Sequence, residues 1–179
     1  MMNDTVKVWD PLVRVFHWAL VVCFAVAWIS ADEWQDIHEV AGYAVAALVA
    51  FRVVWGLFGS RYARFSQFAR RPHVVAGYLS DILKGREVRY LGHNPAGGAM
   101  VFALLFSLAG LTLTGWLYTD WLWGEEWVEE THELLSNILL VLVGLHVAGV
   151  ILASLRHREN LVKSMINGRK RIPDDTDVD

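Results

Sequence analysis

The sequence predicts an all-α membrane protein in which four hydrophobic stretches cross the bilayer and form a four-transmembrane-helix bundle. The 179-residue chain is 55% hydrophobic and contains nine tryptophans, which is more apolar surface than a soluble domain of this size readily buries. A membrane-spanning helix needs about 20 apolar residues. Four stretches meet this length: about 12–31, 37–59, 96–119 and 132–155.

The first stretch begins after a polar N-terminal segment and has no small-residue cleavage site, so we do not expect a removed signal peptide. It contains Cys23, the only cysteine of the chain. A single cysteine excludes disulfide bonds within the chain, thiolate metal clusters and the C-x-x-C-H attachment of a c-type haem.

The positions of the basic residues predict how the helices are oriented. The sixteen lysines and arginines lie near the N-terminus, at the far end of the second stretch, in the 60–95 loop, or after Leu155. The short loops near 32–36 and 120–130 contain none. By the positive-inside rule, both termini and the long loop are cytoplasmic, and the short loops are periplasmic or extracellular. Short loops also make the helices they join antiparallel neighbours.

The long loop and the C-terminus carry two further predictions. Apolar residues recur at helical spacing over about 72–86, between basic ends, which favours an amphipathic helix on the cytoplasmic leaflet. A solvated basic loop held near the lipid by charge remains an alternative. Residues 1–172 are expected to form a single domain, and the acidic tail 173–179 is expected to be disordered.

Four histidines lie within the predicted spans, where an ionisable side chain is costly and often functional: His17, His38, His132 and His146. Taken singly, the two near the interface, His38 and His132, are also explained as helix-capping residues. The deeper two are also explained as hydrogen-bonded histidines of the bundle core.

The two histidines of the last stretch stand fourteen residues apart. Fourteen helical steps return a side chain to within about 40° of its starting direction and move it about 21 Å along the axis. His132 and His146 therefore face one interior at two depths, where the predicted topology also places His38 and His17, respectively. Each pair is able to clamp one iron from opposite sides. This is the bis-imidazole arrangement of a b-type haem that is held without covalent attachment.

Arg52 stands fourteen residues after His38, at the depth predicted for the inner pair. A guanidinium at this depth needs an anion, which a haem propionate would supply. Snorkelling of the side chain to the inner headgroups explains Arg52 equally well. The other histidines have no partner at matching depth and are expected at the surface: His73, His93 and His157.

These residues resemble the prokaryotic cytochrome b561 family, whose relatives include the b-type cytochrome subunits of nickel-iron hydrogenase and formate dehydrogenase. The resemblance extends from VWDPLVRVFHW to ENLVKSMINGRKR. It implies one haem ligand in the opening W-D-P-x-x-R-x-x-H-W motif, at His17, one in the second helix, at His38, and two in the fourth, at His132 and His146. The chain departs from the family in the short connection between its first two helices, which leaves little surface for docking a hydrogenase subunit and favours a stand-alone cytochrome or a small partner.

We therefore expect two non-covalent b haems (protohaem IX) that pass electrons across the bacterial inner membrane between the quinone pool and a periplasmic redox partner. A c-type cytochrome is the expected partner, because the outward segments carry ten acids and no Lys or Arg, and such a patch steers a basic protein. The ten acids are Asp32, Glu33, Asp36, Glu39, Asp120, Glu125, Glu126, Glu129, Glu130 and Glu133. Topology alone also clears bases from outer loops, so this patch has a second explanation.

Two other functions remain open. The protein is alternatively a quinone oxidoreductase for superoxide or another small molecule, or a haem-free membrane anchor. The sequence predicts contact with membrane lipid and no nucleic-acid partner. It leaves open the oligomeric state, the direction of electron flow and whether the protein is itself an enzyme.

Overall fold

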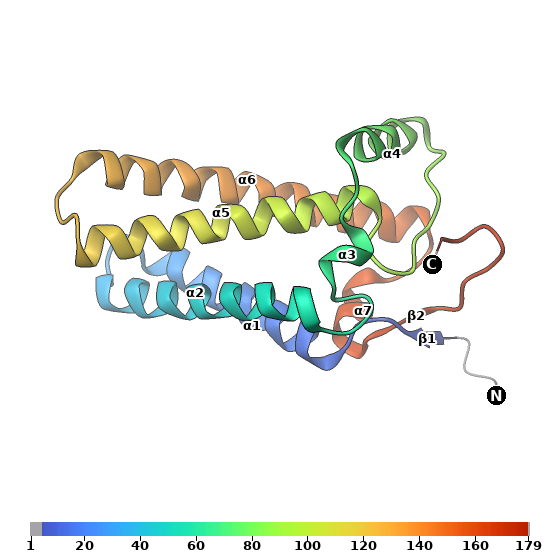
Figure 1. The fold of residues 1–179 in the computed structure, drawn as a ribbon, viewed down its shortest axis with the longest axis horizontal. Helices are drawn as coiled ribbons and strands as arrows, with labels where there is room; N and C mark the ends of the chain where they lie inside the picture. The colour runs from blue at the N-terminus through green and yellow to red at the C-terminus, as the bar shows by residue number, and fades with distance from the viewer. Residues whose placement is uncertain (1–4, 179) are drawn as a thin grey trace. The chain divides into compact units, whose positions relative to one another are not determined.

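The structure is a computed structural model that describes residues 5–178 (Figure 1). Four long helices dominate it: α1 (Pro11–Ser30), α2 (Gln35–Phe58), α5 (Pro95–Asp120) and α6 (Glu126–Arg156). Each is long and apolar enough to cross a membrane. The prediction of an all-α membrane protein with four spanning helices is therefore confirmed.

The shorter elements precede, connect or follow these helices. They are β1 (Thr5–Lys7), α3 (Phe65–Phe68), α4 (Pro72–Lys84), α7 (Leu161–Asn167) and β2 (Arg169–Arg171). The helix α4 occupies most of the predicted amphipathic segment. It buries Tyr78 and leaves Val74, Leu79 and Leu83 exposed, as expected for a helix with one apolar face turned away from the protein.

The helix α6 begins six residues earlier than the sequence pattern predicted. The Glu125 carbonyl accepts the backbone N–H of Val128, and Glu126 and Glu129 lie in the first helical turn. Carboxylates are favourable there because the helix dipole is positive at its N-terminus. Part of the acidic segment is therefore helix and not loop.

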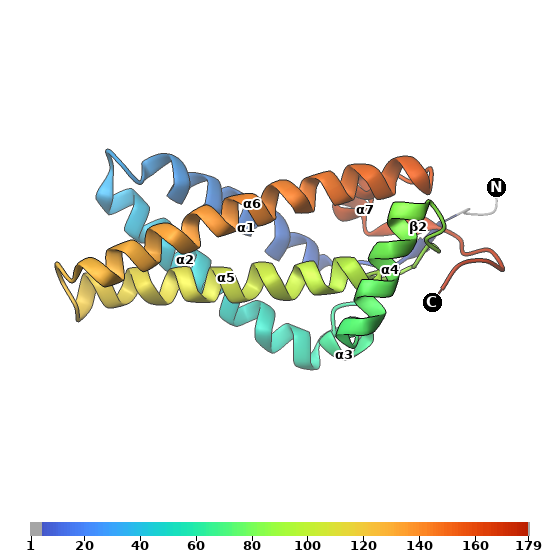
Figure 2. The same cartoon turned by 90° about the horizontal axis from the view of Figure 1, so that it is seen from above.

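The chain forms two compact units, and each of the four long helices contributes to both. The helical unit comprises residues 15–54 and 103–144. Within it, the ends of α5 and α6 that the 121–125 loop joins lie side by side in Figures 1 and 2. Its buried apolar residues come from all four helices: Phe16, Ala41, Val45, Val49, Leu105, Leu108, Val128 and Leu139.

The terminal unit comprises residues 5–14, 55–102 and 145–178. Its strands β1 and β2 pair antiparallel, with Val6 opposite Lys170. Val8, Trp9 and Leu91 form a small buried cluster beside this pair. The N-terminal strand is therefore held against the end of the chain.

The C-terminal segment differs from the disordered tail that we expected. Val178 forms a parallel β-bridge with Tyr90, and its backbone N–H donates to the Arg89 carbonyl. The Asp177 side chain is only 2% exposed and pairs with the Arg89 guanidinium. Residues 173–178 are thus bound by contacts with a loop that is distant in the sequence.

Candidate functional site

His38 and His132 come together inside the helical unit. Their ring centres are 6.1 Å apart and the rings are inclined at 68°. An imidazole–metal bond of about 2.0 Å on each side of one iron, and about 1.1 Å from each nitrogen to its ring centre, requires centres about 6 Å apart. The side chains of this pair therefore fit an iron that is ligated from both sides.

The hydrogen bonds of the two rings select the nitrogen that remains for a metal. His38 Nδ1 lies 2.8 Å from the backbone carbonyl of Ala27. A carbonyl only accepts, so Nδ1 of His38 carries the proton and Nε2 keeps its lone pair. His132 Nδ1 lies 3.0 Å from the hydroxyl of Thr114 on α5. Both rings are thus oriented through Nδ1, as second partners orient metal-binding histidines.

Two glycines leave space around this pair. A Cβ atom at Gly115 would lie 3.2 Å from Cε1 of His132, so the glycine permits the close approach of the ring to α5. A Cβ atom at Gly42, one turn after His38 on α2, would meet no other atom within 4 Å. Small residues at these positions fit the bulk of a planar macrocycle between the helices, although they also serve helix packing.

The other predicted ligands are half-buried, and their pairing stays a prediction. His17 lies on α1 in the helical unit, with its ring 5.1 Å from that of Trp18 in an edge-on arrangement. His146 lies on α6 in the part that belongs to the terminal unit. Arg52 on α2 is buried, with 4% of its surface exposed. This burial favours a protein-enclosed guanidinium over one that reaches the headgroups.

Residues of the opening motif that follow Trp9 form hydrogen bonds within the terminal unit. Asp10 accepts the backbone N–H of Val13 at 3.0 Å and so caps α1, and its second oxygen accepts from the side chains of Trp55 and Ser60. Burial alone would raise the pKa of Asp10, but these hydrogen bonds outweigh it and lower the pKa. Arg14 donates to the carbonyl of Ile166 at the end of α7. These residues fasten the start of α1, the helix that carries His17.

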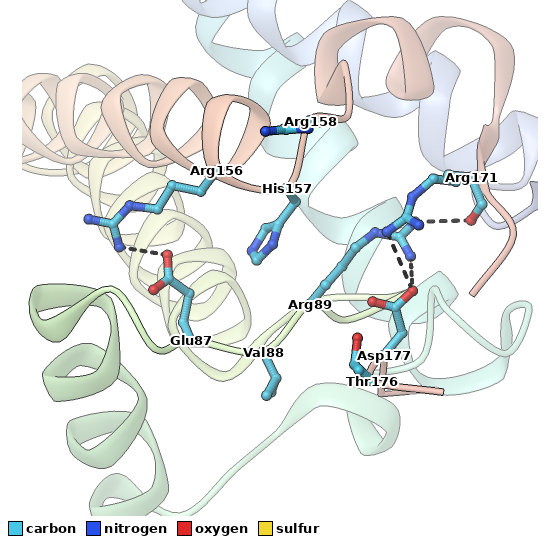
Figure 3. Close-up of a pocket in the computed structure, with 9 residues that line it drawn as sticks. All are labelled: Glu87, Val88, Arg89, Arg156, His157, Arg158, Arg171, Thr176 and Asp177. Atoms are coloured by element: carbon cyan, nitrogen blue, oxygen red, sulfur yellow. Dashed lines mark hydrogen bonds and ion pairs between the residues drawn. The ribbon is translucent and has the colours of Figure 1, made fainter. Parts of the chain in front are cut away.

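A cavity of about 500 Å³ lies in the terminal unit, at the end of α6 (Figure 3). Arg89 lines this cavity and binds Glu159 at 2.9 Å, Asp177, and the Arg171 carbonyl at 3.0 Å. Burial lowers the pKa of Arg89, but these carboxylates outweigh burial and raise it. On the opposite side, Arg156 pairs with Glu87 at 2.7 Å. Ion pairs therefore form much of the cavity wall.

Two of the histidines that we expected at the surface are more enclosed than predicted. The ring of His93 lies 4.8 Å from that of Trp9 and 4.4 Å from that of Phe68. His157 is half-buried at the cavity, and burial lowers its pKa. His73 is exposed, as predicted.

Four spanning helices with an interhelical histidine pair are the arrangement expected of a membrane-bound b-type cytochrome. The model of the prokaryotic cytochrome b561 family matches residues 8–168. The chain belongs to this family, which confirms the predicted resemblance and implies a b-type haem and a role in electron transfer.

Curated relatives agree with this assignment. A probable Ni/Fe-hydrogenase B-type cytochrome subunit of Rhizobium leguminosarum bv. viciae is 24% identical, over 98% of this chain and 92% of the relative. A protein with the same description from Azotobacter vinelandii is 24% identical over 97% and 91%, respectively. The first alignment runs over 226 positions, so this relative carries insertions that the 179-residue chain lacks.

Proposed function

We propose that this protein is a di-haem b-type cytochrome that passes electrons across the membrane through two non-covalent haems. His38 and His132 would hold one haem, and His17 and His146 the other. The 6.1 Å separation of His38 and His132, with both Nδ1 atoms engaged in hydrogen bonds, is the observation that carries the proposal.

The chain's own residues suit outer-sphere electron transfer. A haem iron with two imidazole ligands exchanges one electron and has no open position for oxygen or substrate. His132 and His146 are separated by about 21 Å along α6, which covers most of the roughly 30 Å hydrocarbon layer. With both termini in the cytoplasm, the His38–His132 site lies toward the periplasm and the other toward the cytoplasm.

The haem content of the purified protein tests this proposal. The pyridine haemochrome assay should give two haems per chain, and each of His17→Ala, His38→Ala, His132→Ala and His146→Ala should give one. His38→Ala and His132→Ala should remove the same spectral component. His73→Ala is the matched control, because this exposed histidine of α4 should leave both haems in place.

Three outcomes of this assay contradict parts of the proposal. One haem in the unsubstituted protein would remove the second site. Loss of the same component in His17→Ala and His132→Ala would overturn the pairing. A protein without reducible Soret and alpha bands would be a membrane anchor and not a cytochrome.

We further infer that the redox partners are membrane quinone and a basic periplasmic protein such as a c-type cytochrome. The carboxylates of Glu126, Glu129 and Glu130 are exposed on the first turns of α6, beside exposed Glu125. A rigid helix presents these charges as a fixed patch, which is suited to steering a positively charged partner.

Salt dependence distinguishes this partner from a small donor. Electron transfer to a basic cytochrome should slow steeply between 0.1 M and 1 M salt, because the Debye length shrinks from about 10 Å to about 3 Å. Replacing the four glutamates together by glutamine should reproduce the effect of high salt while the haem content stays unchanged. Stopped-flow rates that respond to neither change would favour superoxide or another small molecule as the electron donor.

A further inference from the structure

The rings of His38 and His132 have hydrogen-bond partners of different kinds. His38 Nδ1 donates to a backbone carbonyl, that of Ala27, at 2.8 Å. His132 Nδ1 meets the hydroxyl of Thr114 at 3.0 Å. A hydroxyl is able to donate or accept, so the state of His132 depends on where the Thr114 proton goes.

The backbone of α5 fixes the direction of this hydroxyl. Thr114 is 8% exposed, and its Oγ1 lies 3.0 Å from the carbonyl of Gly110 and 3.0 Å from that of Leu111. Two oxygens 3.0 Å apart repel each other unless a hydrogen lies between them, so the single hydroxyl proton is best placed toward one of these carbonyls. The oxygen then offers a lone pair to His132, whose Nδ1 must carry a proton.

The opposite arrangement would prevent metal binding by this ring. If Thr114 donated its proton to Nδ1, the proton of neutral His132 would sit on Nε2, the nitrogen that the ring has left for a metal. The hydrogen-bonded chain from His132 through Thr114 to the α5 backbone therefore keeps Nε2 available.

Threonines of membrane helices commonly bond to a preceding carbonyl without any further role. Two others in α5 do so: Thr112 donates to the Leu108 carbonyl at 2.9 Å, and Thr119 to the Gly115 carbonyl at 3.0 Å. Thr114 differs because its oxygen also meets a histidine of another helix. Thr112 is thus a control with the same residue type, helix and backbone bond.

We propose that Thr114 is a positioning residue that fixes the tautomer of His132 and sets the reduction potential of the haem held by His38 and His132. The proposal rests on the proposed function. A proton shared from Nδ1 toward an acceptor increases the electron density at Nε2, which favours the oxidised iron. Loss of this acceptor should raise the reduction potential.

The test is a redox titration of the purified, haem-loaded protein. Thr114→Val, which has nearly the same shape and no hydroxyl, should shift the reduction equilibrium of the His38–His132 haem about tenfold toward the reduced form. A tenfold shift is 59 mV for a one-electron couple. Thr114→Ser restores the hydroxyl and should return the equilibrium to within threefold, and Thr112→Val should leave it unchanged. The other haem should keep its potential in all variants.

The outcomes separate this proposal from the function on which it rests. If His38→Ala removes no haem, the proposed site itself is wrong. If that haem is present but Thr114→Val leaves its potential unchanged, only the role of Thr114 is overturned. If Thr114→Val loses the haem, Thr114→Ser distinguishes the two explanations. Retention of the haem in Thr114→Ser would support the proposed role of the hydroxyl. Loss of the haem would show that the shape of threonine matters and its hydroxyl does not.

Discussion

Arg52 and Arg89 are both buried, with 4% and 5% of their surfaces exposed, but they belong to units of opposite character. Arg89, in the terminal unit, meets the carboxylates of Glu159 and Asp177. Arg52 lies in the helical unit, where we propose a haem propionate as its counter-charge. The chain itself supplies the counter-charges for the arginine of the terminal unit.

Buried polar groups have different uses in the two units. In the terminal unit, buried charges bind one another and fasten the loop at Arg89, the end of α6 and the C-terminal segment together. In the helical unit, the Ala27 carbonyl and the Thr114 hydroxyl orient the rings of His38 and His132. The buried ion pairs of the terminal unit thus serve folding, and the hydrogen bonds of His38 and His132 in the helical unit serve a site that we propose for haem.

The comparison predicts the largest loss of stability for Arg89→Ala. Removing one member of a buried ion pair leaves uncompensated buried charges, here Glu159 and Asp177, and costs about 3–5 kcal/mol. The free energy of unfolding, measured by denaturation in detergent, should fall by this amount. The spectrum of the His38–His132 haem should persist in the folded protein under native conditions.

Arg86→Ala is the matched control for this prediction. Arg86 pairs with Asp81 at 3.7 Å, and both side chains are largely exposed, at 66% and 46%. Exposed pairs contribute about 0–1 kcal/mol, so this substitution should be close to neutral. Equal effects of the two substitutions would mean that the Arg89 network does not stabilise the terminal unit, and the comparison would fail.

The sequence predicted the features that repeat with a local period. Four spanning helices follow from continuous apolar stretches, and the predicted contact of His38 with His132 follows from depth in an antiparallel arrangement. The sequence pattern places the start of α6 too late because it assigns the acidic residues to a loop, although carboxylates stabilise a helix N-terminus.

Contacts between distant residues could not be predicted in this way. The acidic tail has the composition of a disordered segment, but Asp177 binds Arg89, which is 88 residues away. Thr114 is one of several threonines in α5, and nothing in its sequence context distinguishes it from Thr112. The role that we propose for Thr114 depends on the packing of α5 against α6, which brings His132 to its hydroxyl.

The smallest expected effect is that of replacing Arg52. This substitution should change the reduction potential of a haem and leave the fold intact. If the guanidinium lies near a haem propionate, Arg52→Gln removes a positive charge that stabilises the reduced, more negative haem. For charges about 10 Å apart at an effective dielectric constant of about 20, the loss is about 1–2 kcal/mol, or on the order of 50 mV for one electron. Redox titration should therefore show a lower potential for the haem that we assign to His17 and His146. Arg52→Lys keeps the charge and should keep most of the potential. An unchanged titration in Arg52→Gln would show that the burial of Arg52 serves packing. Arg52 and Arg89 would then both serve the fold, and neither would serve the haem.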